Sequence, residues 1–442
     1  MTPIHERPAG LLQQLVRFDT TNPPGNEAAC VRYVADLLQQ GGIDYRIIAK
    51  DEARPNLLAR LPGAGQAPPL LLYGHVDVVT AADQQWTHPP FSGAIADGYV
   101  WGRGTLDMKG GVTMMIAACL RARAHGFTPP GDVLLLVLAD EEVGGRYGAG
   151  YLVNEHPELF EGVRFGIGEV GGYTSYLRGR KYYPIQVAEK SGCGTMVTFR
   201  GPGGHGSMPL RGGAMAQLGR ALQILDRSRL PVHVTPGVRL MIEALAGPLP
   251  ADEREQLLRL LDPAQTDQVL DQLGEFGRWL EPLLHNTFNA TIVQGGHKSN
   301  VVPSEVRLRL DVRILPGQDC DKVHGELRDL LGPDVELELQ RMGGKGVSPE
   351  QPDMGLFATL ADVLRQGDPD AIPVPAITPA GTDGRWFSQL GIQSYGFLPM
   401  DLPPEIEFMS ALHAADERIP VASMDFGTNA MYSLIQRFGE AE

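Results

Sequence analysis

The 442-residue sequence lacks the features that mark membrane, disulfide-rich and nucleic-acid-binding proteins. Its apolar runs, such as residues 133–139, are far too short to span a bilayer. Four cysteines are scattered without a C-x-x-C pair, which argues against a disulfide framework and favours reduced thiols. Basic residues number 38 against 53 acidic ones, a formal charge of −15, and such a surface repels phosphate backbones. We therefore expect neither a membrane nor a nucleic acid as a partner.

The N-terminus has no basic segment followed by an apolar stretch, so the sequence predicts no signal peptide and a cytoplasmic location. Apolar residues make up 43% and charged residues 21%, which is typical of a globular protein. A chain of this length exceeds one ordinary core and suggests two domains.

Strand-like and helical segments alternate between about residues 30 and 190 and again beyond about 349. This alternation predicts an α/β domain, with a mixed, largely parallel sheet between layers of helices. Between these parts the pattern is that of a two-layer α+β domain, with strands at 195–200, 289–294 and 306–314. Helices are expected at 212–226 and 251–279. We therefore predict one domain from residues 1–189 and 344–442, interrupted by an inserted domain at 190–343.

Acidic and histidine residues follow three of the predicted strands of the first domain. His75 follows the apolar run 70–73, Glu142 follows the run 133–138, and Glu169 follows 165–168. Ligands of open α/β sheets bind at the carboxyl ends of the strands, so these side chains are expected to share one rim. Clustered carboxylates repel one another in a cleft and need a cation. Imidazole with carboxylates suits zinc, and also cobalt or manganese.

Two further residues fit this rim. Asp77 stands two positions after His75, where a carboxylate commonly receives the second ring nitrogen of a ligating histidine. Asp107 lies in a glycine-rich segment before the helix predicted at 107–124. Its spacing is equally compatible with a metal ligand and with the N-cap of that helix.

Together these segments resemble a known family. The sequences LYGHVDVV at 72–79, GRGTLDMKG at 102–110 and DEE at 140–142 are similar to three signatures of the dinuclear zinc aminoacylase/carboxypeptidase family. That family includes acetylornithine deacetylase, succinyl-diaminopimelate desuccinylase, aminoacylase and glutamate carboxypeptidase. The resemblance covers nearly the whole chain. It implies a zinc-peptidase-like catalytic domain with an inserted lid and dimerisation domain.

The resemblance also implies a ligand set for two zinc ions per subunit, with cobalt or manganese as alternatives. One metal would take His75, Asp107 and Glu169, and the other Asp107, Glu142 and His413, with Asp107 bridging. His413 is identified only by the resemblance, through ALHAADE at 411–417. Glu at position 169 favours deacylases and carboxypeptidases over aminopeptidases, although Val170 replaces a frequent proline.

Further roles follow from the same resemblance. Glu141 matches the general base, and Asp77 matches the residue that orients His75. His205, in GPGGHGSMP at 201–209, would stabilise the oxyanion, often in the neighbouring subunit's site; by itself it reads as an ordinary loop histidine. Asn300, in KSNVVP at 298–303, would contact substrate.

The substrate carboxylate would be bound by Arg385, in GTDGR at 381–385, because a planar guanidinium meets a carboxylate bidentately. By itself Arg385 reads as a surface arginine in a turn. Arg313 is a weaker candidate for the same task.

The sequence thus predicts a hydrolase of N-acyl amino acids or small peptides with a free carboxylate, acting as a homodimer on a small-molecule substrate. A dipeptidase or C-terminal exopeptidase is the alternative within enzymes, since both cleave an amide next to a carboxylate. A non-catalytic relative that binds a ligand is the alternative outside enzymes. Its hallmark, loss of Glu141 or of a metal ligand, is not found in the sequence.

Overall fold

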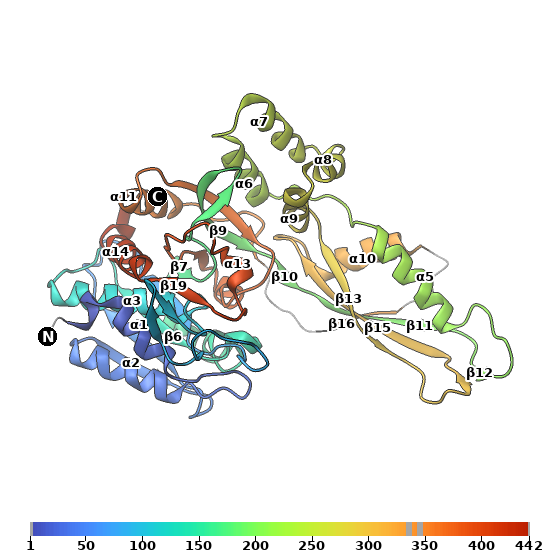
Figure 1. Cartoon of the computed structure of the whole chain (residues 1–442), viewed down its shortest axis with the longest axis horizontal. Helices are drawn as coiled ribbons and strands as arrows, with labels where there is room; N and C mark the ends of the chain where they lie inside the picture. The colour runs from blue at the N-terminus through green and yellow to red at the C-terminus, as the bar shows by residue number, and fades with distance from the viewer. Residues whose placement is uncertain (1–2, 333–337, 343–347, 441–442) are drawn as a thin grey trace. The chain divides into compact units, whose positions relative to one another are not determined.

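The computed structural model describes residues 3–332, 338–342 and 348–440, and it divides into two compact units (Figure 1). The first unit comprises residues 1–187, 353–376 and 382–442, and the second comprises 188–352 and 377–381. The sequence suggested 190–343 for the inserted domain; the later of these limits lies outside the described residues. None of the helices in the described ranges has the length and apolar composition that crossing a membrane requires.

The first unit is built on a nine-stranded mixed sheet, as expected. Its four central neighbours β6, β3, β7 and β18 run parallel, and antiparallel strands flank them. Strand β8 (Ser175–Leu177) pairs only with β9 on one side. The other strands are, in order across the sheet, β1 (Asp44–Ile48), β2 (Asn56–Leu61), β6 (Val133–Leu138), β3 (Leu70–His75), β7 (Phe165–Gly168), β18 (Gln393–Gly396), β9 (Arg180–Glu189) and β17 (Ile372–Thr378).

Helices cover both faces of this sheet because each central strand is apolar on both sides. Strand β3 illustrates the alternation: Leu70 and Leu72 belong to the larger core cluster, whereas Leu71 and Tyr73 belong to the smaller cluster on the opposite face. The smaller cluster packs beneath α4 (Ala149–Glu155) and α12 (Gly384–Phe387). The larger one is covered by α1 (Pro8–Val16), α2 (Ala28–Gln40), α3 (Lys109–Ala124), α11 (Phe357–Gly367) and α14 (Val421–Arg437).

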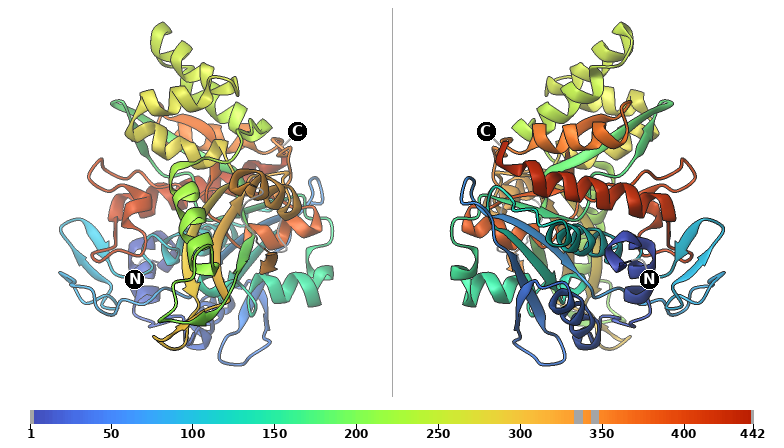
Figure 2. Two further views of the ribbon diagram at one scale, coloured as in Figure 1. Left: turned by 90° about the vertical axis from the view of Figure 1, so that its right-hand side faces the viewer. Right: turned by 90° about the vertical axis from the view of Figure 1, so that its left-hand side faces the viewer.

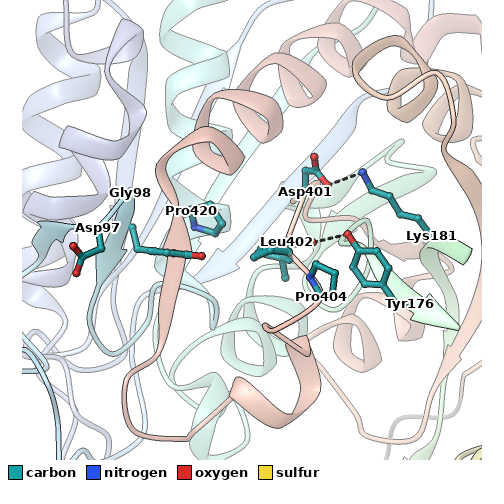
Figure 3. A pocket seen from close by; sticks show the side chains of 10 residues that line it. Asp97, Gly98, Tyr176, Lys181, Asp401, Leu402, Pro404 and Pro420 are labelled. Carbon is teal, nitrogen blue, oxygen red and sulfur yellow. Dashed lines mark hydrogen bonds and ion pairs between the residues drawn. The ribbon is translucent and has the colours of Figure 1, made fainter. Parts of the chain in front are cut away.

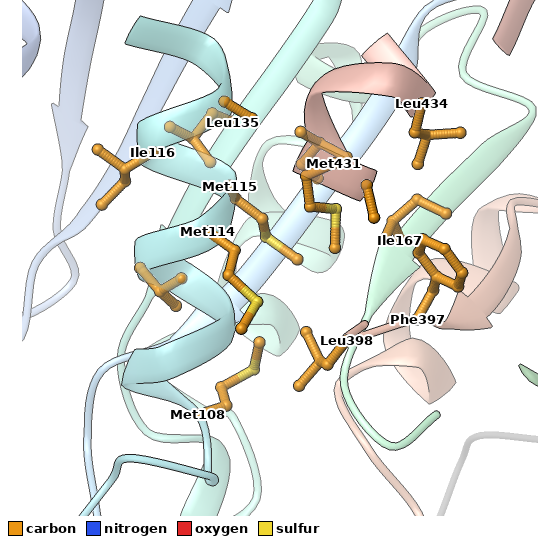
Figure 4. Packing of buried hydrophobic residues seen from close by; sticks show 14 of the residues in the cluster. Met108, Met114, Met115, Ile116, Leu135, Ile167, Phe397, Leu398, Met431 and Leu434 are labelled. Atoms are coloured by element: carbon orange, nitrogen blue, oxygen red, sulfur yellow. The ribbon is translucent and has the colours of Figure 1, made fainter. Parts of the chain in front are cut away.

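Helix α3 is the central helix of the larger face and packs beside α14 (Figure 2). It is buried on almost every side, which explains why its sequence is apolar without a clear polar stripe. In Figure 4 its Met114 and Met115 point toward Met431 of α14 and Leu398. These flexible side chains fill the space between the helices and the sheet.

A small three-stranded sheet joins distant parts of the first unit. It consists of β4 (Ala94–Ala96), β5 (Tyr99–Trp101) and β19 (Arg418–Pro420), with β5 in the middle. Arg418 pairs with Trp101 in an antiparallel register. The segments that follow Trp101 and precede Arg418 are thereby held side by side, and each carries a predicted metal ligand.

The second unit is a two-layer α+β domain, as the sequence predicts. Helices α5 (Ala214–Arg227) and α10 (Cys320–Leu331) pack on one face of its five-stranded sheet, burying Val197, Leu218 and Leu308. The sheet contains β10 (Ser191–Gly192), β15 (Glu305–Ile314), β11 (Gly194–Arg200) and β16 (Glu338–Met342), with β13 (Thr287–Gln294) also paired to β15.

Two expectations for this unit are wrong. The helical stretch predicted at 251–279 is interrupted near Pro263, which cannot donate to a continuing helix, and at Gly274, whose φ is +60°. Its helices are α7 (Ala251–Leu258), α8 (Thr266–Leu273) and α9 (Glu275–Leu284), after α6 (Pro236–Ala246). The expectation of reduced thiols also fails for Cys193 and Cys320, which form a disulfide across 127 residues of sequence.

Candidate metal centre

The predicted ligands meet at the carboxyl ends of three adjacent parallel strands. His75 is the last residue of β3 and pairs with Leu138, the last residue of β6. Glu142 follows β6 in the short 3-10 helix η2 (Glu141–Val143), and Glu169 follows β7 directly. These groups converge because the carboxyl ends of adjacent parallel strands lie at one edge of the sheet, as expected from the sequence.

Five side chains form two groups that could each hold a metal ion. His75, Asp107 and Glu169 make one, and Asp107, Glu142 and His413 make the other, with ligand atoms within 4.8 Å of one another. Asp107 belongs to both.

The two oxygens of Asp107 face different histidines. Its Oδ1 lies 3.0 Å from Nε2 of His75, and its Oδ2 lies 3.1 Å from Nε2 of His413. On the far sides, Glu169 Oε2 is 3.4 Å from His75 Nε2, and Glu142 Oε2 is 3.4 Å from His413 Nε2. Helix α3 starts only at Lys109, and the side chain of its N-cap residue Met108 makes no capping bond. The cap reading of Asp107 is therefore wrong.

The chemistry of this donor set fits a pair of divalent cations. Burial raises the pKa of Glu142 and of Glu169, because both carboxylates are shielded from water and Asp107 lies close to each. Oε1 of Glu142 is buried and has no hydrogen-bond partner among the described residues. A buried acceptor of this kind costs free energy unless a partner occupies it. Two imidazoles and three carboxylates are ligands that zinc accepts.

Asp77 holds the loop of Glu141 and Glu142 as well as facing His75. Its carboxylate accepts hydrogen bonds from the backbone N–H of Glu141 at 3.1 Å and of Glu142 at 3.2 Å, and from Asn22 Nδ2 at 2.8 Å. Nδ1 of His75 lies 3.0 Å from the carbonyl oxygen of Asp77 and 3.5 Å from its Oδ1. Asp77 thus contacts His75 from one ligand group and the backbone of Glu142 from the other.

Glu141 lies beside the ligand groups without belonging to either. Burial raises its pKa well above the usual value, and the nearby charge of Glu169 adds to the effect. Nη1 of Arg385, from α12, lies 4.0 Å from Oε1 of Glu141. The centre therefore combines a buried carboxylate with a cation that is suited to an anionic substrate.

The remaining predicted residues, His205, Asn300 and Arg313, lie in the second unit. His205 ends β12 (Gly204–His205), which pairs with β14 (Val301–Val302), and the carbonyl of Asn300 accepts from Gly206 N–H at 2.8 Å. The structure thus brings the His205 and Asn300 segments together. Arg313 donates to both carboxylate oxygens of Asp311, at 2.9 and 3.2 Å, so its guanidinium already has a carboxylate partner.

A separate hollow of about 540 Å³ lies elsewhere on the first unit (Figure 3). Tyr176, Lys181 and Asp401 line it, and Lys181 is paired at 2.7 Å with both Asp401 and Asp368. The cation among its lining residues is thus already balanced by two carboxylates, and no predicted site residue lines it.

The comparison with family models decides the family. The model of peptidase family M20/M25/M40 matches residues 71–437. The chain belongs to this family. Membership makes it a metal-dependent hydrolase of the peptidase and amidohydrolase type.

Several M20 relatives are similar over most of the chain. Aminoacylase-1 of Sus scrofa is 27% identical, over 92% of this chain and 89% of the relative. Probable carboxypeptidase S-like 2 of Dictyostelium discoideum is 27% identical, over 83% and 71%. The structure of an M20 family metallo-carboxypeptidase from Sulfolobus solfataricus has a TM-score of 0.68 at 18% identity, covering 98% and 99%. The last likeness supports the fold.

Sequence reasoning missed a buried network behind the centre. Arg54 donates to both oxygens of Glu27, at 2.6 and 3.1 Å, and to Asp140 Oδ1 at 2.9 Å. Asn22 Nδ2, which donates to Asp77, also lies 3.2 Å from Asp140 Oδ1. The position of Asp140 next to Glu141 was the one available signal; nothing in the sequence places Arg54 or Asn22 near it.

Proposed function

We propose that this M20 hydrolase cleaves the amide bond of N-acyl amino acids or small peptides that carry a free carboxylate. The observation that carries the proposal is the shared Asp107, with a histidine at each of its oxygens and Glu141 beside both ligand groups. The 4.0 Å approach of Arg385 to Glu141 supports an anionic substrate.

His75, Asp107 and Glu169 would hold one zinc ion, and Asp107, Glu142 and His413 the other, with cobalt or manganese as alternatives. When bound, the metals supply an acidified water and polarise the scissile carbonyl. The donor set supports zinc but does not discriminate it from the alternatives. Metal analysis of the purified protein, with zinc, cobalt and manganese each restored to the stripped enzyme, tests this assignment.

Glu141 is the general base of the proposed reaction. Its carboxylate accepts the proton of the attacking water and returns it to the leaving nitrogen, so one residue serves both halves of the hydrolysis. Burial raises the pKa of this carboxyl in the metal-free chain, and cations bound beside it would lower that pKa again. Asp77 positions it by holding the backbone N–H of the same loop.

Arg385 binds the substrate carboxylate and thereby orients the scissile amide. A guanidinium 4.0 Å from the base places the substrate anion near the reacting atoms, which reduces the entropy cost of the reaction. Arg313 is the weaker candidate because Asp311 already occupies its donors.

The second unit is proposed as a lid and dimerisation domain. In this proposal His205 stabilises the oxyanion and Asn300 contacts the substrate. His205 ends β12 and Asn300 directly precedes the paired strand β14, and this adjacency supports a common task. A cytoplasmic homodimer remains the expected form; sedimentation of the purified chain measures the oligomeric state.

Deacylation is the leading reaction, and dipeptide or C-terminal exopeptidase cleavage is the alternative. The similarity to aminoacylase-1 favours the first, and the similarity to a carboxypeptidase S-like protein favours the second; Glu169 fits both. A panel of N-acetyl, N-succinyl and N-long-chain-acyl amino acids and of dipeptides, each with its carboxyl-amidated counterpart, separates them. Turnover of the amidated compounds at the same rate would contradict the role of the carboxylate.

A further inference from the structure

Two ligands of the second group come from segments far apart in the chain, and one of them is poorly shielded. Asp107 and His413 are 306 residues apart, and the side chain of His413 is 51% exposed. The backbone of His413 has a φ of +60°, a conformation that non-glycine residues rarely adopt. Surrounding groups must therefore fix both segments.

Glu417 fixes the Asp107 segment. Its side chain is fully buried, and Oε1 accepts hydrogen bonds from the backbone N–H of Leu106 at 2.7 Å and of Asp107 at 3.2 Å. Oε2 accepts from the N–H of Gly104 at 3.1 Å. One carboxylate thus gathers three backbone N–H groups of the segment that leads into the shared ligand.

Arg103 connects this carboxylate to the His413 segment. Its Nη1 donates to Glu417 Oε2 at 2.7 Å and to the carbonyl of Ala414 at 3.2 Å. Its Nη2 donates to the carbonyl of His413 at 3.1 Å and to Oε1 of Gln84 at 2.9 Å. The guanidinium is 1% exposed, so water does not compete for these bonds.

Gln84 closes the same network from the surface. Its Nε2 donates to the carbonyl of His413 at 2.8 Å, while its Oε1 receives Arg103. The carbonyl of His413 therefore accepts two side-chain donors. These contacts hold the peptide in its left-handed conformation and aim the imidazole at Asp107.

We propose that Arg103 and Glu417 form a positioning clamp that presets Asp107 and His413 for metal binding. The proposal rests on the metal centre of the proposed function, and it assigns to these two residues no contact with metal or substrate. A buried ion pair contributes little net stability compared with apolar packing. Its hydrogen bonds instead end on the two ligand segments, which is where partners of metal ligands act.

The test measures metal affinity, because a purely structural role would not change the affinity of the folded fraction. In the wild-type chain both carboxylate oxygens of Glu417 accept hydrogen bonds from N–H groups. Glu417→Gln keeps the shape of the side chain, but its NH₂ group must face one of these N–H donors whichever way the amide is turned. Gln84→Ala removes two hydrogen bonds without burying an uncompensated charge. The matched control is Gln85→Ala, at an exposed neighbouring residue.

Each metal-free variant is titrated with zinc against a chromophoric chelator and with cobalt followed by its absorption spectrum. For the ion held by Asp107, Glu142 and His413, here called the second ion, we expect about 10–100-fold weaker binding in Glu417→Gln. We expect a smaller loss in Gln84→Ala and none in Gln85→Ala. Thermal unfolding of the metal-free variants reports their stability separately. If Glu417→Gln does not fold, Arg103→Lys decides: it keeps the buried positive charge but cannot reach Glu417, Ala414 and His413 together, and it should weaken binding of the same ion.

Wild-type affinity for both ions in the folded variants would overturn the clamp, even if their melting temperatures fell. A wild-type protein that binds no second ion would instead contradict the proposed function. The two failures are distinguishable because the first leaves the metal stoichiometry of the wild-type chain intact.

Discussion

Replacing Glu141 by glutamine is the sharpest perturbation of the proposed mechanism. The Glu141→Gln variant would keep the size of the side chain and the backbone N–H that Asp77 accepts, but its amide cannot take a proton from water. General acid–base catalysis contributes about 10²–10⁴-fold to enzymatic rates, which corresponds to about 3–5 kcal/mol of barrier. We expect kcat to fall by at least that factor, because in the proposed mechanism Glu141 serves both proton transfers.

Metal binding should survive this substitution. Glu141 is absent from both ligand groups, so the variant is expected to retain two ions with affinities near those of the wild type. Its effect on KM should be small and favourable, since Arg385 loses a neighbouring negative charge and becomes freer to bind the substrate anion. Steady-state kinetics with an N-acyl amino acid and metal analysis of the same preparation measure both quantities.

The matched control is Glu161→Gln, an exposed glutamate on the same unit, which should leave kcat and metal content unchanged. Near-wild-type kcat in Glu141→Gln would refute the assignment of the base. Loss of activity together with loss of metal would refute it too, because the residue would then act as a ligand.

Three further predictions address other parts of the molecule. Hydrogen bonds to Asp107 and Glu142 raise the pKa of metal-free His413 to about 10, so below that pH a metal must displace its proton. Zinc affinity should therefore rise about tenfold per pH unit for each proton displaced, and calorimetry in buffers of different ionisation enthalpy should detect the released proton. An affinity that does not change with pH would contradict this prediction. Arg385→Met should raise KM for carboxylate substrates far more than for their amides, in parallel kinetic assays. Leu135→Ala, in the core of Figure 4, should cost about 2–5 kcal/mol of unfolding free energy, measured by urea denaturation of the metal-free chain.

The elements of this protein that could be predicted are those that local sequence patterns indicate. The strands at 133–138 and 165–168 have the bounds that their apolar runs indicate, because continuous apolar stretches of that length are typical of buried parallel strands. From those bounds alone, Glu142 and Glu169 could be placed on one rim. His413 follows no such strand, and only its resemblance to a family motif made it a candidate.

The unpredictable part depends on contacts between distant segments. The break of 251–279 into separate helices is an exception, because Pro263 and Gly274 are local signals that could have predicted it. The pairing of Cys193 with Cys320 spans 127 residues and requires the packing of α10 against the sheet. No local spacing encodes such a pair.

The same limit explains why the residues that support the metal centre escaped sequence reasoning while its ligands did not. Three of the proposed ligands, His75, Glu142 and Glu169, are particular residue types at strand ends, and this leaves a readable pattern. Supporting residues such as Arg54 and Arg103 need only reach a loop from wherever the fold places them. Both are buried arginines that donate to loops carrying the ligands, one through Asp140 and one at the carbonyl of His413. A buried arginine with its donors directed at ligand loops is therefore a structural sign of a preorganised centre that local sequence patterns do not reveal.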